Sequence, residues 1–593
     1  MTLTAVEKSL SEALSQSLNR VYGFSPAPFA LQETRREFSG TFTAVVFGWA
    51  KDLRLSPEVV GQAIGEDLVK TCTLVSGFSV VKGFLNMELN AIVWHSLFLT
   101  IRDDSAFGCK PISKEAPIAL VEYASPNTNK PLHLGHLRNI LLGHSVAKLL
   151  AADGQRVKRV QIINDRGIHI CKSMLAWQKF GEGETPQSSG LKGDHLVGKY
   201  YVAFDVAYKA EVAQRVAQGS TEEEAKKSAP LLVEAQDMLR AWENNDPAVR
   251  HLWSTMNGWV YEGFNATYDR LGVSFDQNYY ESDTYLLGKS DIERGLANGV
   301  FYRREDGSVW IDLTSDGLDE KVVLRKDGTS VYMTQDVGTA IQRSKDFNMD
   351  SMTYVVGNEQ DYHFKVLFLI LKKLGYDWAD RLFHLSYGMV DLPTGRMKSR
   401  EGTVVDADDL LDEMEQTAEA LSEELGKLEG MPTQEKKDLY RTLGYGALKY
   451  YILKVEPTKR MVFNPEESID FNGHTGPFIQ YAHARIQSLL RKGQRVEYDV
   501  HSISWDAREE ELVYQIAKFP SVVSAAANSH NPSLVAQYVY DLVKVFNGYY
   551  QNISILNAET PQIAAFRLDL SATVAYLLHK GLDLLGIEAP QRM

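Results

Sequence analysis

The sequence predicts a multidomain protein in which an open α/β domain stands between a small α+β domain and an all-α bundle. An apolar run over 118–124, a helical pattern that stops at Gly154 and a second predicted strand over 157–163 form a strand–helix–strand unit. Such a unit implies a parallel sheet with a right-handed crossover. From about residue 456 onward the apolar spacing is helical throughout, and 593 residues suffice for three or four domains.

The composition is that of an ordinary soluble protein. No apolar run approaches the ~20 residues that span a bilayer, so no membrane partner is expected. The first residues lack an apolar signal core and carry Glu7 and Glu12, which favours a cytoplasmic location. Cys72, Cys109 and Cys171 are isolated, so we expect neither a disulfide framework nor a cysteine zinc site.

A His-x-Gly-His motif stands where the helix of the strand–helix–strand unit begins. A helix N-terminus attracts phosphate, and His133 and His136 would donate hydrogen bonds to a polyphosphate. Gly135, which has no side chain, would let a flat base approach the backbone. The alternative is coincidence, since the motif arises by chance in roughly one such chain in 40.

Two carboxylates, Glu122 and Asp336, lie at or near predicted strand ends in apolar surroundings. Ligands of open α/β sheets bind at such ends. Taken alone, a solvated carboxylate or a helix cap remains the simpler interpretation of each, because Asp336 would make a good N-cap residue.

The wider string VEYASPNTNKPLHLGHLRN, residues 121–139, closely resembles the ATP-binding signature of the arginyl-tRNA synthetases, which are class I aminoacyl-tRNA synthetases. The resemblance extends over nearly the whole chain. It implies a Rossmann-type catalytic domain that activates L-arginine with ATP and Mg²⁺ to arginyl-adenylate and transfers arginine to tRNA(Arg). It further implies a cytoplasmic monomer that uses no zinc and needs bound tRNA before it activates arginine.

The resemblance also implies the site residues. The positions matched to arginine binding are Glu122, Asn127, Tyr332, Asp336 and Gln360. Those matched to ATP binding, besides the two histidines, are Gly135, Gly357, His363, Met389 and Val390. A pair of fixed carboxylates suits the planar guanidinium fork and disfavours the single ammonium of lysine.

Residues 395–402, GRMKSREG, resemble the second class I signature, Lys-Met-Ser-Lys-Ser, with departures. Arg396 replaces the first lysine, Lys398 replaces the serine, and Ser399 stands where the second lysine would be. In the family a lysine just before the histidines supplies the missing charge, which here is Lys130. Arg396, Lys398 and Lys130 are therefore expected to assist catalysis, and an ordinary surface loop is the alternative.

A net charge of −14 is atypical of an RNA-binding protein, but net charge does not describe local clusters of basic residues. Residues 472–486, NGHTGPFIQYAHARI, resemble the start of the family's anticodon-binding bundle, and basic residues follow. The tRNA contacts expected there are Tyr481, Arg485, Arg491 and Lys492. Aromatic side chains in this stretch would stack on bases or pack in the bundle core.

The resemblance divides the chain into four parts. They are a tRNA-elbow-binding domain (1–113), the Rossmann-type catalytic domain (114–400, with insertions at about 171–255 and 285–328), a helical connector (401–455) and the helical anticodon-binding domain (456–593). Residues 193–201, GDHLVGKYY, resemble the family without suggesting a chemical role, so we expect a structural one.

Other functions fit parts of the sequence. A catalytically silent, RNA-binding paralogue would explain the altered second signature, but the intact histidines and Lys130 argue against it. A small nucleotidyltransferase would share the histidine motif but not the helical C-terminal half. A synthetase for cysteine would need zinc ligands that three scattered cysteines do not supply.

Overall fold

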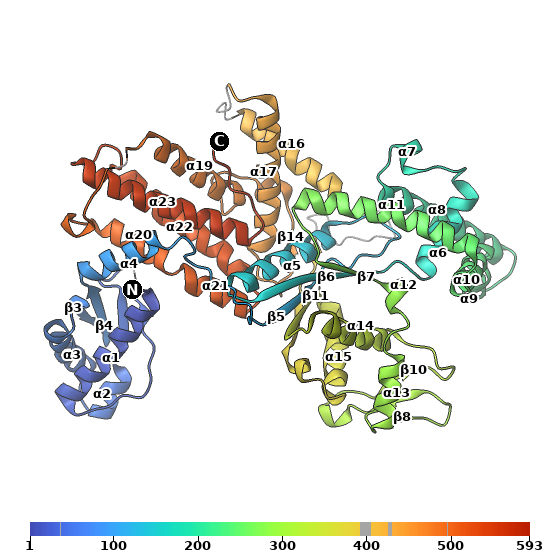
Figure 1. Cartoon of the computed structure of the whole chain (residues 1–593), viewed down its shortest axis with the longest axis horizontal. Helices are drawn as coiled ribbons and strands as arrows, with labels where there is room; N and C mark the ends of the chain where they lie inside the picture. The colour runs from blue at the N-terminus through green and yellow to red at the C-terminus, as the bar shows by residue number, and fades with distance from the viewer. Residues whose placement is uncertain (36, 392–404, 425–429, 495) are drawn as a thin grey trace.

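The computed structural model describes the whole chain except residues 36, 392–404, 425–429 and 495 (Figure 1). The N-terminal part is an antiparallel four-stranded sheet in the order β1-β2-β4-β3, packed with helices. Its elements are α1 (Leu3–Tyr22), β1 (Gln32–Glu33), β2 (Phe42–Val45), α2 (Phe47–Leu53), α3 (Pro57–Thr71), β3 (Val75–Val81), β4 (Phe84–Leu89) and α4 (Ala91–Asp103). Val6, Leu10 and Leu14 of α1 are buried at helical spacing, which directs one face of the helix into this core.

A five-stranded parallel sheet in the order β12-β11-β5-β6-β7 forms the centre of the molecule. Its strands are β5 (Ile118–Glu122), β6 (Arg156–Ile163), β7 (Gln277–Tyr280), β11 (Ser351–Gly357) and β12 (Leu382–Tyr387). The helix α5 (Leu134–Ala152) connects β5 to β6, so the predicted strand–helix–strand unit is confirmed. Because all the strands are parallel, Glu122, Gly357 and the residues after Ile163 and Tyr280 lie along one edge of the sheet.

Two insertions interrupt the sheet. The first is helical and comprises α6 (Ile168–Phe180), α7 (Pro186–Ser189), α8 (Gly193–Ala217), α9 (Glu222–Ser228), α10 (Pro230–Glu243) and α11 (Pro247–Leu271). The second comprises α12 (Glu281–Thr284), α13 (Lys289–Ala297), β8 (Tyr302–Arg303), β9 (Val309–Ile311), η1 (Thr314–Asp316) and β10 (Lys321–Leu324). The second insertion contains the antiparallel pair β9–β10, which β8 extends to three strands.

The polypeptide then returns to the central sheet. The elements that complete this part are α14 (Tyr332–Phe347), η2 (Asn358–Gln360), α15 (Asp361–Lys373), η3 (Asp377–Arg381) and the parallel pair of β13 (Val390–Asp391) and β14 (Met461–Val462). α14 and α15 share a hydrophobic core with β11, which fixes the start of α14 near the edge where the strands end.

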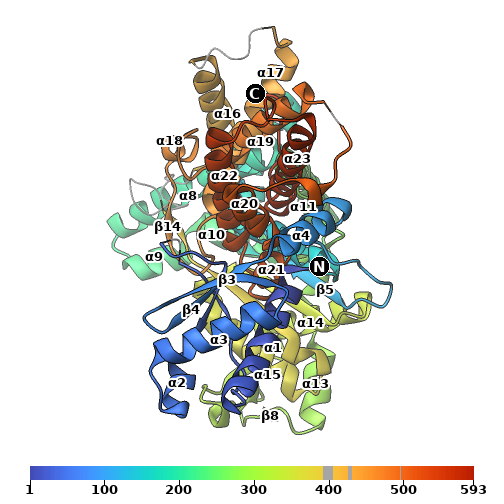
Figure 2. The same cartoon turned by 90° about the vertical axis from the view of Figure 1, so that its left-hand side faces the viewer.

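The C-terminal part is entirely helical within its described residues, apart from β14. Its helices are α16 (Ala407–Glu424), α17 (Thr433–Leu453), α18 (Pro465–Ser468), α19 (Gly476–Lys492), η4 (Val500–Ser502), α20 (Ala507–Ala517), α21 (Phe519–Asn528), α22 (Ser533–Asn552) and α23 (Pro561–Leu584). The bundle lies over the N-terminal domain (Figure 2), where Phe98 of α4 packs edge-on against Phe566 of α23. Among the described residues no helix has the length and apolar character needed to cross a membrane.

Candidate active site

The two motif histidines form the N-terminal cap of α5. The backbone N–H of Gly135 donates to Nδ1 of His133, and the backbone N–H of His133 donates to Nδ1 of His136, both at 3.1 Å. Because each Nδ1 accepts a hydrogen bond, a neutral ring carries its proton on Nε2. The ring centroids are 3.9 Å apart, so the two imidazoles act as a unit.

Both imidazoles are neutral at pH 7. Burial lowers the pKa of His133 to about 4, and the charge of Lys130 lowers it further. Burial likewise holds the pKa of His136 well below its ordinary value. The pair therefore offers Nε2–H donors beside a helix N-terminus, an arrangement suited to phosphate oxygens.

The segment Val405–Ala407 is hydrogen-bonded to the histidine motif. The Leu134 N–H donates to the Val405 carbonyl at 3.1 Å, and the Ala407 N–H donates to the Leu132 carbonyl at 3.0 Å. The predicted catalytic residues Arg396 and Lys398, which precede this segment, lie outside the described residues. Among the residues matched to ATP binding, the Val390 side chain is buried and the Met389 side chain is exposed.

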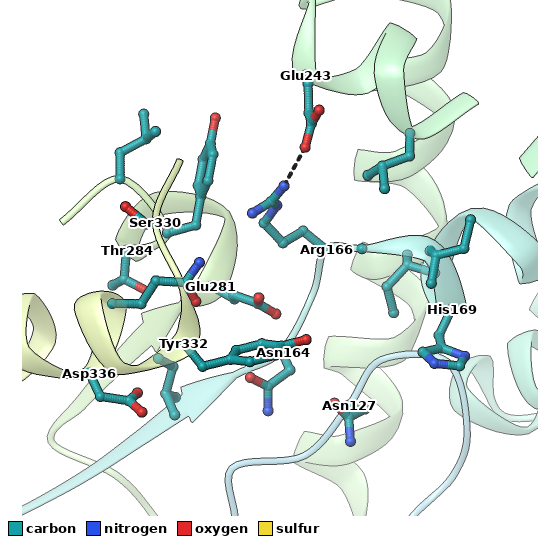
Figure 3. Close-up of a pocket in the computed structure, with 18 of the residues that line it drawn as sticks. Asn127, Asn164, Arg166, His169, Glu243, Glu281, Thr284, Ser330, Tyr332 and Asp336 are labelled. Atoms are coloured by element: carbon teal, nitrogen blue, oxygen red, sulfur yellow. Dashed lines mark hydrogen bonds and ion pairs between the residues drawn. The ribbon is translucent and has the colours of Figure 1, made fainter. Parts of the chain in front are cut away.

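A cavity of about 1070 Å³ opens at the strand ends beside this motif (Figure 3). Four predicted site residues line it, and they come from the loop after β5 and the start of α14: Asn127, Lys130, Tyr332 and Asp336. Asn164, Arg166, His169 and Glu281 also line the cavity, and of these His169 and Glu281 were not predicted. Two segments that insertions separate in the sequence thus form one site.

Three carboxylates line this cavity: Asp336, Glu281 and Glu243, of which Glu243 is ion-paired with Arg166. Asp336 Oδ2 is 2.6 Å from Nε2 of His363, which brings a residue matched to arginine binding into contact with one matched to ATP binding. Burial raises the pKa of Glu281 to about 7; Arg166 opposes the rise, whereas Asp165 and Asp336 add to it. Glu281 directly follows β7, and an acidic residue placed directly after a strand is the sequence pattern that would have predicted it as a site residue.

Glu122, the other predicted carboxylate, is not among the residues that line the cavity. It is 7% exposed at the end of β5, and its carboxylate is ion-paired with the buried Arg343 of α14. Arg343 lies seven residues after Asp336 and therefore near the same face of that helix. The charges of Glu122 and Asp336 both add to the rise in the pKa of the Tyr354 phenol that burial causes. The two carboxylates therefore act on the same buried hydroxyl, although each is paired with a different residue.

The remaining predicted residues surround the cavity without lining it. Gly357 is buried at the end of β11, and Gln360 is exposed at the end of η2. His363, in the first turn of α15, reaches the cavity through its contact with Asp336.

The basic stretch of α19 borders a separate cavity of about 550 Å³. Tyr481, Arg485 and Arg491 line it, together with the C-terminal residues Arg592 and Met593. The Arg485 guanidinium carbon is 4.7 Å from the centroid of the Tyr481 ring, a cation–π contact on the bundle surface. Lys492 is exposed at the end of the same helix.

Comparisons with known proteins show the family of this chain. A family model described as tRNA synthetases class I (R), catalytic domain, matches residues 105–465, and one described as DALR anticodon binding domain matches 479–593. Curated arginine–tRNA ligases of Flavobacterium psychrophilum and Bacteroides thetaiotaomicron are 56% and 53% identical, each over 99% of this chain and 100% of that protein. The structure of Thermus thermophilus arginyl-tRNA synthetase covers 99% of this chain with a TM-score of 0.78 at 26% identity, and is covered in full. The chain belongs to the arginyl-tRNA synthetases, as residues 121–139 predict, and is an arginine–tRNA ligase that forms arginyl-adenylate from arginine and ATP and transfers arginine to tRNA(Arg).

Proposed function

We propose that the 1070 Å³ cavity is the arginine site of this ligase and that the histidine motif beside it binds ATP. The observation that carries the proposal is the pair Asp336 and Glu281, two carboxylates that line one cavity at the strand ends. A guanidinium presents five donors in a plane and is best bound by acceptors placed on more than one side. The single ammonium of lysine cannot bridge two separated carboxylates in the same way, so this pair selects arginine.

The other arginine-binding residues are assigned by position. Tyr332 is 75% exposed at the start of α14, so its ring is available to cover the guanidinium plane. Asn127 lines the cavity and is assigned to the α-amino group, and Gln360 remains a predicted contact. Glu122 can bind the substrate arginine only if the substrate shares its carboxylate with Arg343, because the two side chains are ion-paired.

Adenylate formation needs no side-chain nucleophile. A carboxylate oxygen of arginine attacks the α-phosphorus of ATP, a new oxygen–phosphorus bond forms, and pyrophosphate leaves with the electrons of the broken bond. The neutral His133 and His136 donate hydrogen bonds to the phosphates, and Lys130, which lines the cavity, supplies positive charge. We propose that Arg396 and Lys398 add charge at the leaving pyrophosphate.

Mg²⁺ is proposed to accompany ATP as its counterion, because it usually binds through substrate phosphates and water rather than a protein cage. The carboxylate of Asp406, on the segment bonded to the histidine motif, already pairs with His195. The described residues near the histidines therefore fit a metal held mainly by the nucleotide.

The helical half is proposed to hold the tRNA. Tyr481 and Arg485 combine an aromatic face with a cation, and Arg491 and Lys492 extend the basic stretch along α19. Residues 1–113 are assigned to the tRNA elbow on the family resemblance alone. The proposal extends to a monomer that acts in the cytoplasm.

Pyrophosphate exchange tests the substrate assignments. We expect exchange that depends on arginine and on added total tRNA, with no comparable exchange when lysine or glutamate replaces arginine. Robust exchange without tRNA would refute the tRNA requirement. Equal exchange with lysine would refute selection by the carboxylate pair.

A further inference from the structure

The stretch GDHLVGKYY, residues 193–201, has no part in the mechanism above, yet it begins α8 beside the active site. At Gly198 an added Cβ would lie 2.8 Å from Cδ of Pro131, so α8 packs directly against the residue between Lys130 and the histidine motif. At Gly193 an added Cβ would overlap the carbonyl oxygen of Trp259 in α11, which leaves the start of α8 no room to move that way.

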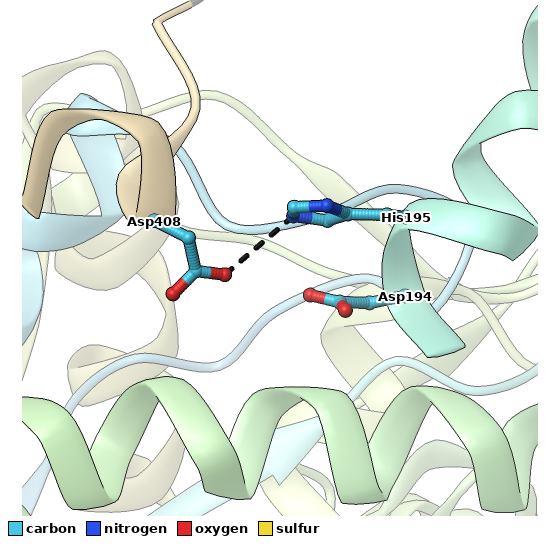
Figure 4. Close-up of side chains that lie close together, drawn as sticks. All are labelled: Asp194, His195 and Asp408. Atoms are coloured by element: carbon cyan, nitrogen blue, oxygen red, sulfur yellow. Dashed lines mark ion pairs between the residues drawn. The ribbon is translucent and has the colours of Figure 1, made fainter. Parts of the chain in front are cut away.

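The first turn of α8 is also ion-paired with the start of α16. His195 Nε2 is 3.2 Å from Oδ2 of Asp406. The same nitrogen is 3.5 Å from Oδ2 of Asp408, and Figure 4 shows this second contact. Lys192, which precedes α8, lies 3.2 Å from the fully buried Asp194 and is ion-paired with Asp408.

These groups pair opposite charges. The described members are four carboxylates and three cations: Asp194, Asp406, Asp408, Asp412, Lys192, His195 and Arg270. A divalent metal at Asp194, His195 and Asp408 would have to displace the ammonium of Lys192, so the arrangement is that of an ion-pair cluster.

The cluster reaches the ATP site through the backbone. Asp406 faces His133 in an antiparallel bridge, and its neighbours Val405 and Ala407 hydrogen-bond to Leu134 and Leu132. The same carboxylate that pairs with His195 therefore lies on a segment that is hydrogen-bonded to both sides of His133.

We propose that His195 is a positioning residue for ATP, which acts by holding the segment Val405–Asp408, and with it His133 and His136, in place. The inference rests on the proposed ATP site and deepens it. The carboxylates of Asp406 and Asp408, with which His195 is ion-paired, raise the pKa of His195 to about 10, so the bridge is charged at neutral pH.

The test measures KM for ATP and for arginine in pyrophosphate exchange with tRNA present, for His195→Gln, Asp406→Asn and the double variant. Glutamine retains a donor without the charge, and asparagine retains the oxygen that caps α16. We expect each single variant to raise KM for ATP about 10-fold and to leave KM for arginine within about twofold. His251→Gln, an exposed histidine on α11, is the matched control and should change neither.

The double variant and His133→Asn separate the outcomes. If the charges act as one unit, the double variant raises KM for ATP no more than the larger single change, whereas multiplication of the two changes overturns the inference. His133→Asn should raise KM for ATP. If it does so while His195→Gln changes only melting temperature and active fraction, His195 is merely structural and the inference fails. If His133→Asn leaves KM for ATP unchanged, the proposed ATP site itself fails.

Discussion

The carboxyl of Glu281 provides the sharpest prediction about arginine binding, because its pKa lies near 7 in the free enzyme. A guanidinium binds the carboxylate and not the neutral acid, so only the ionised fraction of the enzyme is competent. With a pKa of about 7, that fraction is about one part in 11 at pH 6 and about ten parts in 11 at pH 8. We therefore expect kcat/KM for arginine to fall about 10-fold from pH 8 to pH 6.

The assay is tRNA-dependent pyrophosphate exchange at saturating MgATP between pH 5.5 and 8.5, for the wild-type enzyme and Glu281→Gln. The pH dependence of kcat/KM reports the pKa values of groups in the free enzyme, and it is in the free enzyme that burial raises the pKa of Glu281. The variant should bind arginine more weakly at pH 8 and lose most of the pH dependence. A wild-type profile that is flat across pH 7, or one that Glu281→Gln leaves unchanged, would refute the assignment.

Four further changes test the site. Asp336→Asn should raise KM for arginine about 10-fold, because it removes about 1.5 kcal/mol of charge-assisted binding from a carboxylate whose side chain is 41% exposed. KM for ATP should stay within about twofold. Equal rises in both KM values would contradict the assignment of Asp336 to arginine. His133→Asn should raise KM for ATP and also lower kcat for adenylate formation about 100-fold at nearly unchanged melting temperature, and a loss in kcat of less than threefold would count against a role in the transition state. Because the pKa of His195 is raised to about 10 in the folded protein, its protonated ring stabilises the fold fully below the unfolded pKa of about 6.5 and progressively less as the pH rises toward 10. The difference in free energy of unfolding in urea between the wild type and His195→Gln should therefore shrink between pH 7 and 10. A difference that stays constant would show that the charge of His195 is not involved. Arg491→Ala should raise KM for tRNA and flatten its salt dependence while both small-substrate KM values stay unchanged, and a changed arginine KM would count against a purely RNA-binding role.

The start of the parallel sheet could be predicted because its first strand, Ile118–Glu122, is almost wholly buried and therefore appears as a continuous apolar run. The strand predicted at 157–163 is Arg156–Ile163, although basic residues interrupt its apolar positions. The helix between them was equally clear, because its apolar positions recur with the helical period up to Gly154. Signals of this kind depend only on neighbours within one segment.

The partners of the site residues could not be predicted, because they depend on sheet order and on contacts between distant segments. Arg343 pairs with Glu122 across 221 residues, and no local pattern distinguishes it from other basic residues of α14. Glu281 is one acid among several in its stretch, and it reaches the cavity only because β7 adds to the edge of the sheet beside β6. The family resemblance supplied Asp336, but the position of Glu281 in the same cavity follows only from the order of the strands in the sheet.

The acidity of the arginine cavity is set by segments that lie far apart in the chain. Arg166, in the turn after β6, opposes the rise in the pKa of Glu281, and it is itself ion-paired with Glu243 at 2.7 Å and stacked 3.9 Å from the centroid of the Tyr285 ring (Figure 3). Glu243 ends α10 of the helical insertion, so that helix holds the cation that limits protonation of Glu281, the carboxylate proposed to bind arginine. A fixed cation beside Glu281 also repels the guanidinium of an arginine substrate. The ion pair with Glu243 offsets part of the charge of Arg166, so Arg166 holds the pKa of Glu281 near neutrality without closing the cavity to arginine.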